Sequence, residues 1–131
     1  MKIKVKNTTP EIFMKRAFWL AWQACGGTMG MGFFRDRPEA TEEDVWKNVC
    51  SNGDYVINTN GKNEFYGDYV FGRMVKWGGK VEDGIISFYG SDDFDRSYQG
   101  FARKYPNSKV LLDATAKSLK CSYSVEKKNE T

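Results

Sequence analysis

The sequence predicts a single compact α+β domain, with three to four helices around a central apolar helix and a small antiparallel or mixed sheet. Residues 10–25 form a long apolar stretch with helical spacing, and residues 2–6 and 85–89 have the alternation or the β-branched composition of strands. Because 131 residues suffice for one core and no linker divides them, we expect one domain over residues 1–121. Residues 122–131 are polar and are expected to form a disordered tail.

Residues 2–6 (KIKVK) alternate charged and apolar side chains, which is the pattern of a short strand with one buried face. Ile3 and Val5 should face the core. The lysines between them should face solvent and discourage pairing along an open edge, because charged side chains protect edge strands.

The central helix is predicted over residues 10–25 (PEIFMKRAFWLAWQAC). Thr9 can cap it, and Pro10 suits the first helical position because its missing N–H would have no partner there. Gly26 can end it in the left-handed conformation. The polar residues of this helix are Glu11, Lys15, Arg16 and Gln23. A helix so apolar should be buried almost all round, either by the rest of the chain or by a second subunit or partner.

The later elements are predicted from caps and turns. Residues 41–44 (TEED) form a capped helix start, and turn residues precede a strand at residues 55–58. A further helix is expected over residues 92–105, where Pro106 would stop it, and a last helix over residues 108–119.

Residues 64–77 fit two patterns. Their aromatic and apolar residues form a helical stripe that Gly78 and Gly79 would end, but several of them also fall on one side of a strand. We expect a helix. It would place Arg73 on the apolar stripe, where the charge needs an anionic partner inside or outside the chain.

The residue types exclude several kinds of chemistry. The chain has no histidine, which rules out serine–histidine and cysteine–histidine pairs and a histidine-ligated zinc within one chain. Cys25, Cys50 and Cys121 are odd in number and lack metal-binding spacing, which favours a reducing, cytoplasmic setting. The net charge of +3 is not an electrostatic footprint for nucleic acid. The uncharged run is shorter than the ~20 residues of a membrane span.

Two groups of carboxylates, residues 42–44 and residues 92–95, could supply an acid–base pair or a cation site. Their positions at predicted helix starts favour capping, and neither group matches a calcium loop. We expect no metal and no cofactor.

The glycine-rich segment at residues 26–32 (GGTMGMG) allows three interpretations. It lacks the lysine and the preceding strand of a known phosphate-binding loop. Its glycines could serve a tight turn against the helix. With Met29 and Met31 beside Arg35 and Arg37, it could also form a contact surface, because methionine and arginine are enriched in interface cores.

The segments FWLAWQACGGTMGMGFF and GDYVFGRMVKW, between Thr9 and Trp77, resemble the small orphan accessory proteins encoded in tailed-bacteriophage genomes. The resemblance covers about the middle half of the chain. It implies a class of action, in which a small protein binds and blocks a host component such as a defence protein. It implies no catalytic residues.

We therefore expect a non-enzymatic binding protein in the cytoplasm, which is the host cytoplasm if a phage encodes it. A homodimer or a complex with a host protein would cover the apolar helix. A sponge for a small anionic ligand such as a signalling nucleotide, and a nucleic-acid binder, remain alternatives. The predicted binding residues are Arg35, Arg37, Arg73, Trp77, Met29 and Met31, because arginine and aromatic side chains form interface hot spots.

Overall fold

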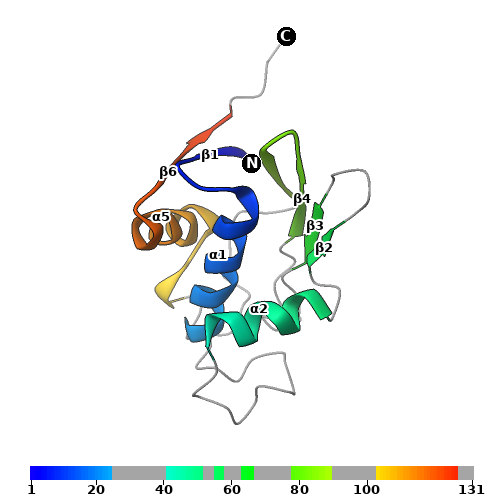
Figure 1. Ribbon diagram of the computed structural model, residues 1–131. Coiled ribbons are helices and arrows are strands. Elements are labelled where there is room, and N and C mark those ends of the chain that lie inside the picture. The colour runs from blue at the N-terminus through cyan, green and yellow to red at the C-terminus, as the bar shows by residue number, and fades with distance from the viewer. Residues whose placement is uncertain (25–40, 52–54, 58–62, 67–77, 90–102, 127–131) are drawn as a thin grey trace.

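The computed structural model describes residues 1–24, 41–51, 55–57, 63–66, 78–89 and 103–126 of the chain (Figure 1). The helices are α1 (Pro10–Ala24), α2 (Glu42–Ser51) and α5 (Ser108–Leu119). The strands are β1 (Lys2–Lys6), β2 (Tyr55–Ile57), β3 (Asn63–Tyr66), β4 (Gly78–Glu82), β5 (Ile85–Tyr89) and β6 (Ser122–Val125). The predicted α+β class is confirmed.

The strands form one sheet in the order β2-β3-β4-β5-β1-β6, and every neighbouring pair is antiparallel. Ile3 of β1 pairs with Ile86 of β5, which pairs with Val81 of β4, and all three side chains are buried. The next row contains Lys4, which is exposed, and Ile85, which is half-buried. Because successive side chains point to opposite faces, the inner face packs in the core and the outer face meets solvent.

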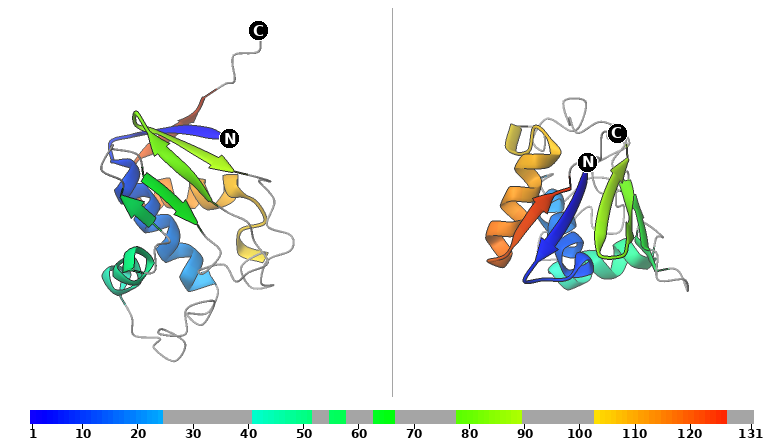
Figure 2. Two further views of the ribbon diagram at one scale, coloured as in Figure 1. Left: turned by 90° about the vertical axis from the view of Figure 1, so that its right-hand side faces the viewer. Right: turned by 90° about the horizontal axis from the view of Figure 1, so that it is seen from above.

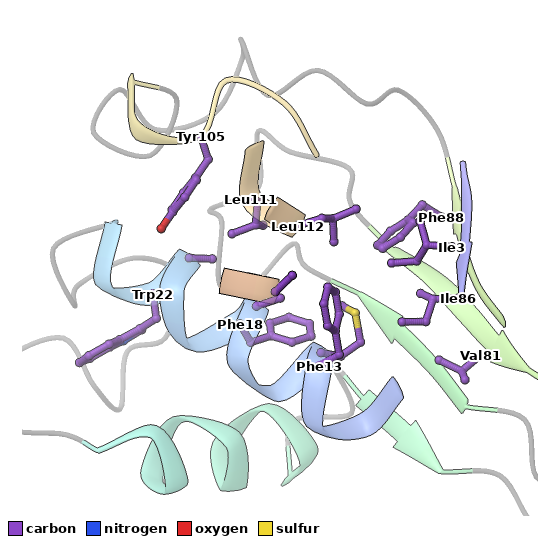
Figure 3. Close-up of a cluster of buried hydrophobic side chains, with 14 of the residues drawn as sticks. Ile3, Phe13, Phe18, Trp22, Val81, Ile86, Phe88, Tyr105, Leu111 and Leu112 are labelled. Atoms are coloured by element: carbon purple, nitrogen blue, oxygen red, sulfur yellow. The ribbon is translucent and has the colours of Figure 1, made fainter. Parts of the chain in front are cut away.

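Helix α1 lies between α5 and α2 and packs against the inner face of the sheet (Figures 1 and 2). Phe13 and Phe18 of α1 are fully buried and point into the core that α5 and the sheet close (Figure 3). Leu111 and Leu112 of α5 enter the same cluster and are also fully buried. The central position predicted for the apolar helix is confirmed.

The predicted helix starts carry the caps that the sequence indicated. Thr9 Oγ1 accepts a hydrogen bond from the Ile12 N–H at 3.2 Å. Thr41 Oγ1 accepts from the Asp44 N–H at 3.2 Å, and Asp44 Oδ2 accepts from the Thr41 N–H at 3.0 Å. The reciprocal pair satisfies two N–H groups that the helix cannot pair internally, and it fixes where α2 begins. Asn107 caps α5 in the same manner as Thr9 caps α1.

The predicted tail is wrong at its start, because Ser122–Val125 form β6 and pair with β1. Tyr123 lies opposite Val5, and its ring meets Phe13 edge-on with centroids 6.1 Å apart. Composition alone does not identify this strand, because Ser122 and Ser124 are polar and the packing comes from the aromatic ring of Tyr123. The domain therefore extends beyond residue 121 to include β6, and residues 127–131 lie outside the described residues.

The edge role predicted for the lysines of β1 is also wrong. This strand pairs with β5 on one side and β6 on the other, although its lysines are exposed and Ile3 is buried as predicted. Alternation identifies the buried face of a strand, but edge strands and inner strands of a one-sided sheet alternate alike. Whether a strand has one neighbouring strand or two depends on segments far along the chain, here β5 and β6.

The helix expected from residue 64 is wrong where the structure describes it. Glu64 to Tyr66 belong to β3, which pairs with β2 and β4, and the glycines expected to end the helix, Gly78 and Gly79, open β4. The periodicity of this segment fits both a helix and a strand. Its residues form a strand because they pair with β2 on one side and β4 on the other. Residues 67–77 lie outside the described residues, as does most of the helix predicted over residues 92–105.

Strand β6 should respond differently to proline at two adjacent positions. The Glu126 N–H donates to the Lys2 carbonyl at 2.8 Å. Because hydrogen-bonded pairs alternate along an antiparallel ladder, the Ser124 N–H also points to β1, whereas the Val125 N–H points to the outer edge. We expect Ser124→Pro to lower the free energy of unfolding by about 1–2 kcal/mol and Val125→Pro to lower it less. Urea denaturation measures both, and equal losses would contradict this register.

Candidate functional site

The six predicted binding residues lie outside the described residues. They are Met29, Met31, Arg35, Arg37, Arg73 and Trp77. Their roles stay predictions, as do the alternatives for the glycine-rich segment. Two surfaces of the described residues, one on α1 and one on the sheet, are candidates for binding instead.

The acidic group at the start of α2 is structural. Asp44 closes the helix cap, Glu42 pairs with Arg16, and Glu43 pairs with Lys15. Each carboxylate therefore has a partner, which agrees with the capping interpretation. Among the residues that the structure describes, no group of histidine, cysteine or carboxylate side chains could hold a metal ion. The second acidic group, at residues 92–95, lies outside them.

Arg16 joins the three helices that the structure describes. From α1, its Nε donates to Glu42 Oε2 of α2 at 2.5 Å, and its Nη1 donates to the Ser118 carbonyl and Oγ of α5 at 3.3 and 3.1 Å. The Arg16 and Glu42 side chains are 27% and 25% exposed, so water screens the pair only in part. A planar guanidinium suits this place because it donates in several fixed directions. Arg16 therefore holds the helical layer together.

The cysteines of the described residues have the character of packing residues. Burial, with the nearby Glu11 carboxylate, raises the pKa of the Cys50 thiol, and burial raises the pKa of Cys121. Both side chains pack against the core and are free thiols. A raised pKa favours the thiol over the reactive thiolate. Cys25 lies outside the described residues.

A small polar cluster fastens β6 to α5. The Tyr123 hydroxyl donates to Asp113 Oδ1, and Lys109 Nζ donates to Asp113 Oδ2 at 2.8 Å. The bond from Lys109, and then that from Tyr123, hold the pKa of Asp113 below its usual value. Burial, and then the bond to Asp113, raise the pKa of Tyr123. These bonds attach β6 to α5, and both carboxylate oxygens of Asp113 are used in them.

The first candidate surface is a strip of α1 that we call the α1 surface: Ile12, Lys15, Arg16 and Trp19. Ile12 is 49% exposed, although it sits on the helix that forms the core. Trp19 is partly buried, and its ring stacks on that of Trp22 with centroids 5.3 Å apart and planes 17° apart. Two helical turns, about 10.5 Å, separate Ile12 from Trp19 on the same side of the helix. The two charged side chains between them are held by α2 and α5.

The burial predicted for α1 is thus achieved on most of its circumference but not all of it. Trp22 is buried, with 3% of its side chain exposed, whereas Ile12 and Trp19 retain contact with solvent. The spacing of these three residues in the sequence indicates one side of the helix. It could not show which of them the other elements would cover.

The second candidate surface is the lysine row, formed by Lys2, Lys4 and Lys6 on the outer face of β1. All three are exposed, and none forms an ion pair with another described residue. Their register partners are Ser87 and Ile85 on β5, opposite Lys2 and Lys4, and Ser124 and Ser122 on β6, opposite Lys4 and Lys6. The alternation at residues 2–6 could have revealed the row, but the strand's two neighbours could not be known from it.

No family model, curated protein sequence or solved structure matches the chain. The resemblance to phage accessory proteins therefore stays a prediction. In the described part of the chain, no helix has the length and apolarity needed to cross a membrane.

Proposed function

We propose that this protein is a non-enzymatic binding protein that occupies another protein stoichiometrically through the α1 surface. The observation that carries the proposal is the exposure of Ile12 on the helix around which the core is built. An isolated exposed isoleucine would be ordinary. Here it lies on the same side as a partly exposed tryptophan, with charged side chains held in place between them.

This arrangement has the layout of an interface hot spot. Tryptophan and arginine dominate such sites, and contacts that are already ordered lose little entropy on binding. Trp19 is backed by the stacked ring of Trp22, and Arg16 is fixed by Glu42 and Ser118. A partner would therefore meet a surface whose side chains are preorganised. A host protein that the chain blocks is the partner that the resemblance to phage accessory proteins suggests.

The experiment compares Ile12→Lys with Val110→Lys. Ile12 and Val110 are both exposed apolar residues on helices, 49% and 37% exposed. Val110 lies in the first turn of α5, whereas the α1 surface bonds to α5 through Ser118 near the other end of that helix. The tagged full chain captures partners from a lysate of the organism that carries the gene, and the purified pair is titrated by calorimetry. We expect a 1:1 complex that Ile12→Lys weakens about tenfold or more, while Val110→Lys leaves it unchanged.

Sedimentation separates a foreign partner from a second copy of the chain. If the protein dimerises and Ile12→Lys makes it monomeric, the α1 surface is a self-association surface rather than a site for a host protein. Equal binding by both variants would exclude the α1 surface. Turnover of a substrate present in large excess over the protein would exclude a stoichiometric function.

A further inference from the structure

We propose that the outer face of the sheet binds the phosphate backbone of a single-stranded nucleic acid along the lysine row. This inference is independent of the α1 surface, because α1 packs on the inner face of the sheet. It rests on three cations in a line on a face that the described helices leave open (Figure 2).

The spacing of the lysine row follows from the strand. Side chains two residues apart on a strand lie on one face, about 6.7 Å from each other, so the row is about 13 Å long. Lys2, Lys4 and Lys6 are exposed at these alternate positions. Since β1 is hydrogen-bonded to β5 and β6, its backbone is held extended and the three lysines stay on one face. A row of evenly spaced cations matches the regular charges of a nucleic-acid backbone.

The residues beside the lysine row leave it accessible. On β5, Ser87 pairs with Lys2 and the half-buried Ile85 pairs with Lys4, and on β6, Ser124 and Ser122 pair with Lys4 and Lys6. Serine side chains are too short to screen a lysine, and their hydroxyls can donate to phosphate oxygens.

The two strands that flank the lysine row, β5 and β6, contain no charged residues. Lys80 of β4 pairs with Ser87 and so belongs to the same row across the sheet as Lys2, and its Nζ lies 3.6 Å from Glu82 Oε2. Glu126 bonds to Lys2 through its backbone and brings one carboxylate to that end of the row. Glu64 of β3 pairs with Lys80, and Asp83 lies in the turn between β4 and β5. Strands β3 and β4 are separated from the lysine row by β5, so Glu126, directly after β6, is the described carboxylate beside the row on a neighbouring segment.

The shape of the face favours a single strand over a duplex. Duplex DNA is read by a helix or a ribbon that enters a groove, and the described outer face consists of strands without such an element. A single strand can lie along an open sheet with its phosphates on the cations. An acidic polypeptide is the competing occupant, and the test includes it.

The test measures anisotropy of a labelled 12-nucleotide oligothymidylate with the full chain. With three phosphate contacts, the slope of log affinity against log salt should be about −2, so affinity should fall about 20-fold from about 50 to about 200 mM salt. The triple variant Lys2→Gln, Lys4→Gln and Lys6→Gln should bind at least about tenfold more weakly at the lower salt, with a slope near zero.

The matched control is the triple variant Lys47→Gln, Lys104→Gln and Lys117→Gln, which removes the same charge from exposed lysines elsewhere. It should keep most of the affinity, and melting temperatures should show that both variants fold. Absence of binding at about 50 mM salt would overturn the proposal. So would equal losses in the two variants, or tighter binding of an oligoglutamate of equal charge than of the oligothymidylate.

Discussion

Phe13→Ala is expected to lower the free energy of unfolding by about 3–5 kcal/mol, the largest effect of any substitution considered for this protein. Phe13 is fully buried on α1, and its ring meets that of Tyr123 on β6. Alanine would remove an aromatic ring from the place where helix and sheet meet and leave a cavity that the packed elements cannot close. The loss should exceed that of a typical core substitution because it loosens β6 as well.

Urea denaturation followed by far-ultraviolet circular dichroism measures this loss. The neighbouring Ile12→Ala is the control, since Ile12 is half-exposed on the same helix and should cost about 1 kcal/mol or less. If Phe13→Ala does not fold, Phe13→Leu should show an intermediate loss, because leucine refills part of the volume. A Phe13→Leu loss no larger than that of Ile12→Ala would contradict the central position of Phe13.

Arg16→Ala is expected to cost about 2–3 kcal/mol, more than a surface charge usually contributes. Exposed ion pairs contribute about 0–1 kcal/mol, whereas breaking a buried pair costs about 3–5 kcal/mol. The expected cost of losing Arg16 lies between these limits because about a quarter of each side chain of the pair is exposed. Arg16 also bonds to Ser118 on a third helix, which adds to the cost. Alanine would leave the partly buried Glu42 carboxylate without its partner.

A double-mutant cycle of Arg16→Ala and Glu42→Ala isolates the pair. We expect a coupling energy of about 1 kcal/mol or more. The cycle of Lys15→Ala and Glu43→Ala is the matched control, because it joins the same two helices but Glu43 is 75% exposed, and its coupling should be about 0.5 kcal/mol or less. Equal couplings would mean that Arg16 is an ordinary surface residue.

Local features of the chain were predicted well because neighbouring residues produce them. Thr9 and Thr41 cap helices through bonds to groups three residues away, so the sequence alone located both starts. The alternation of β1 identified Ile3 as a buried residue in the same way. In the candidate site, by contrast, the sequence favoured arginines outside the described residues and interpreted the lysines of β1 only as edge protection. Whether a charge is paired depends on segments far along the chain, as Arg16 and Ser118 illustrate.

The sequence by itself determined the α+β class, the central apolar helix and the residue types that exclude histidine chemistry, because propensity, capping and composition are local properties. Only the tertiary structure decided that β1 is an inner strand, that residues 63–66 form a strand and that Ser122–Val125 complete the sheet. It also decided which side of α1 stays open and that the lysine row lies unpaired among the described residues. These outcomes depend on strand pairing and helix packing between distant segments, whose free energies no short window of sequence contains.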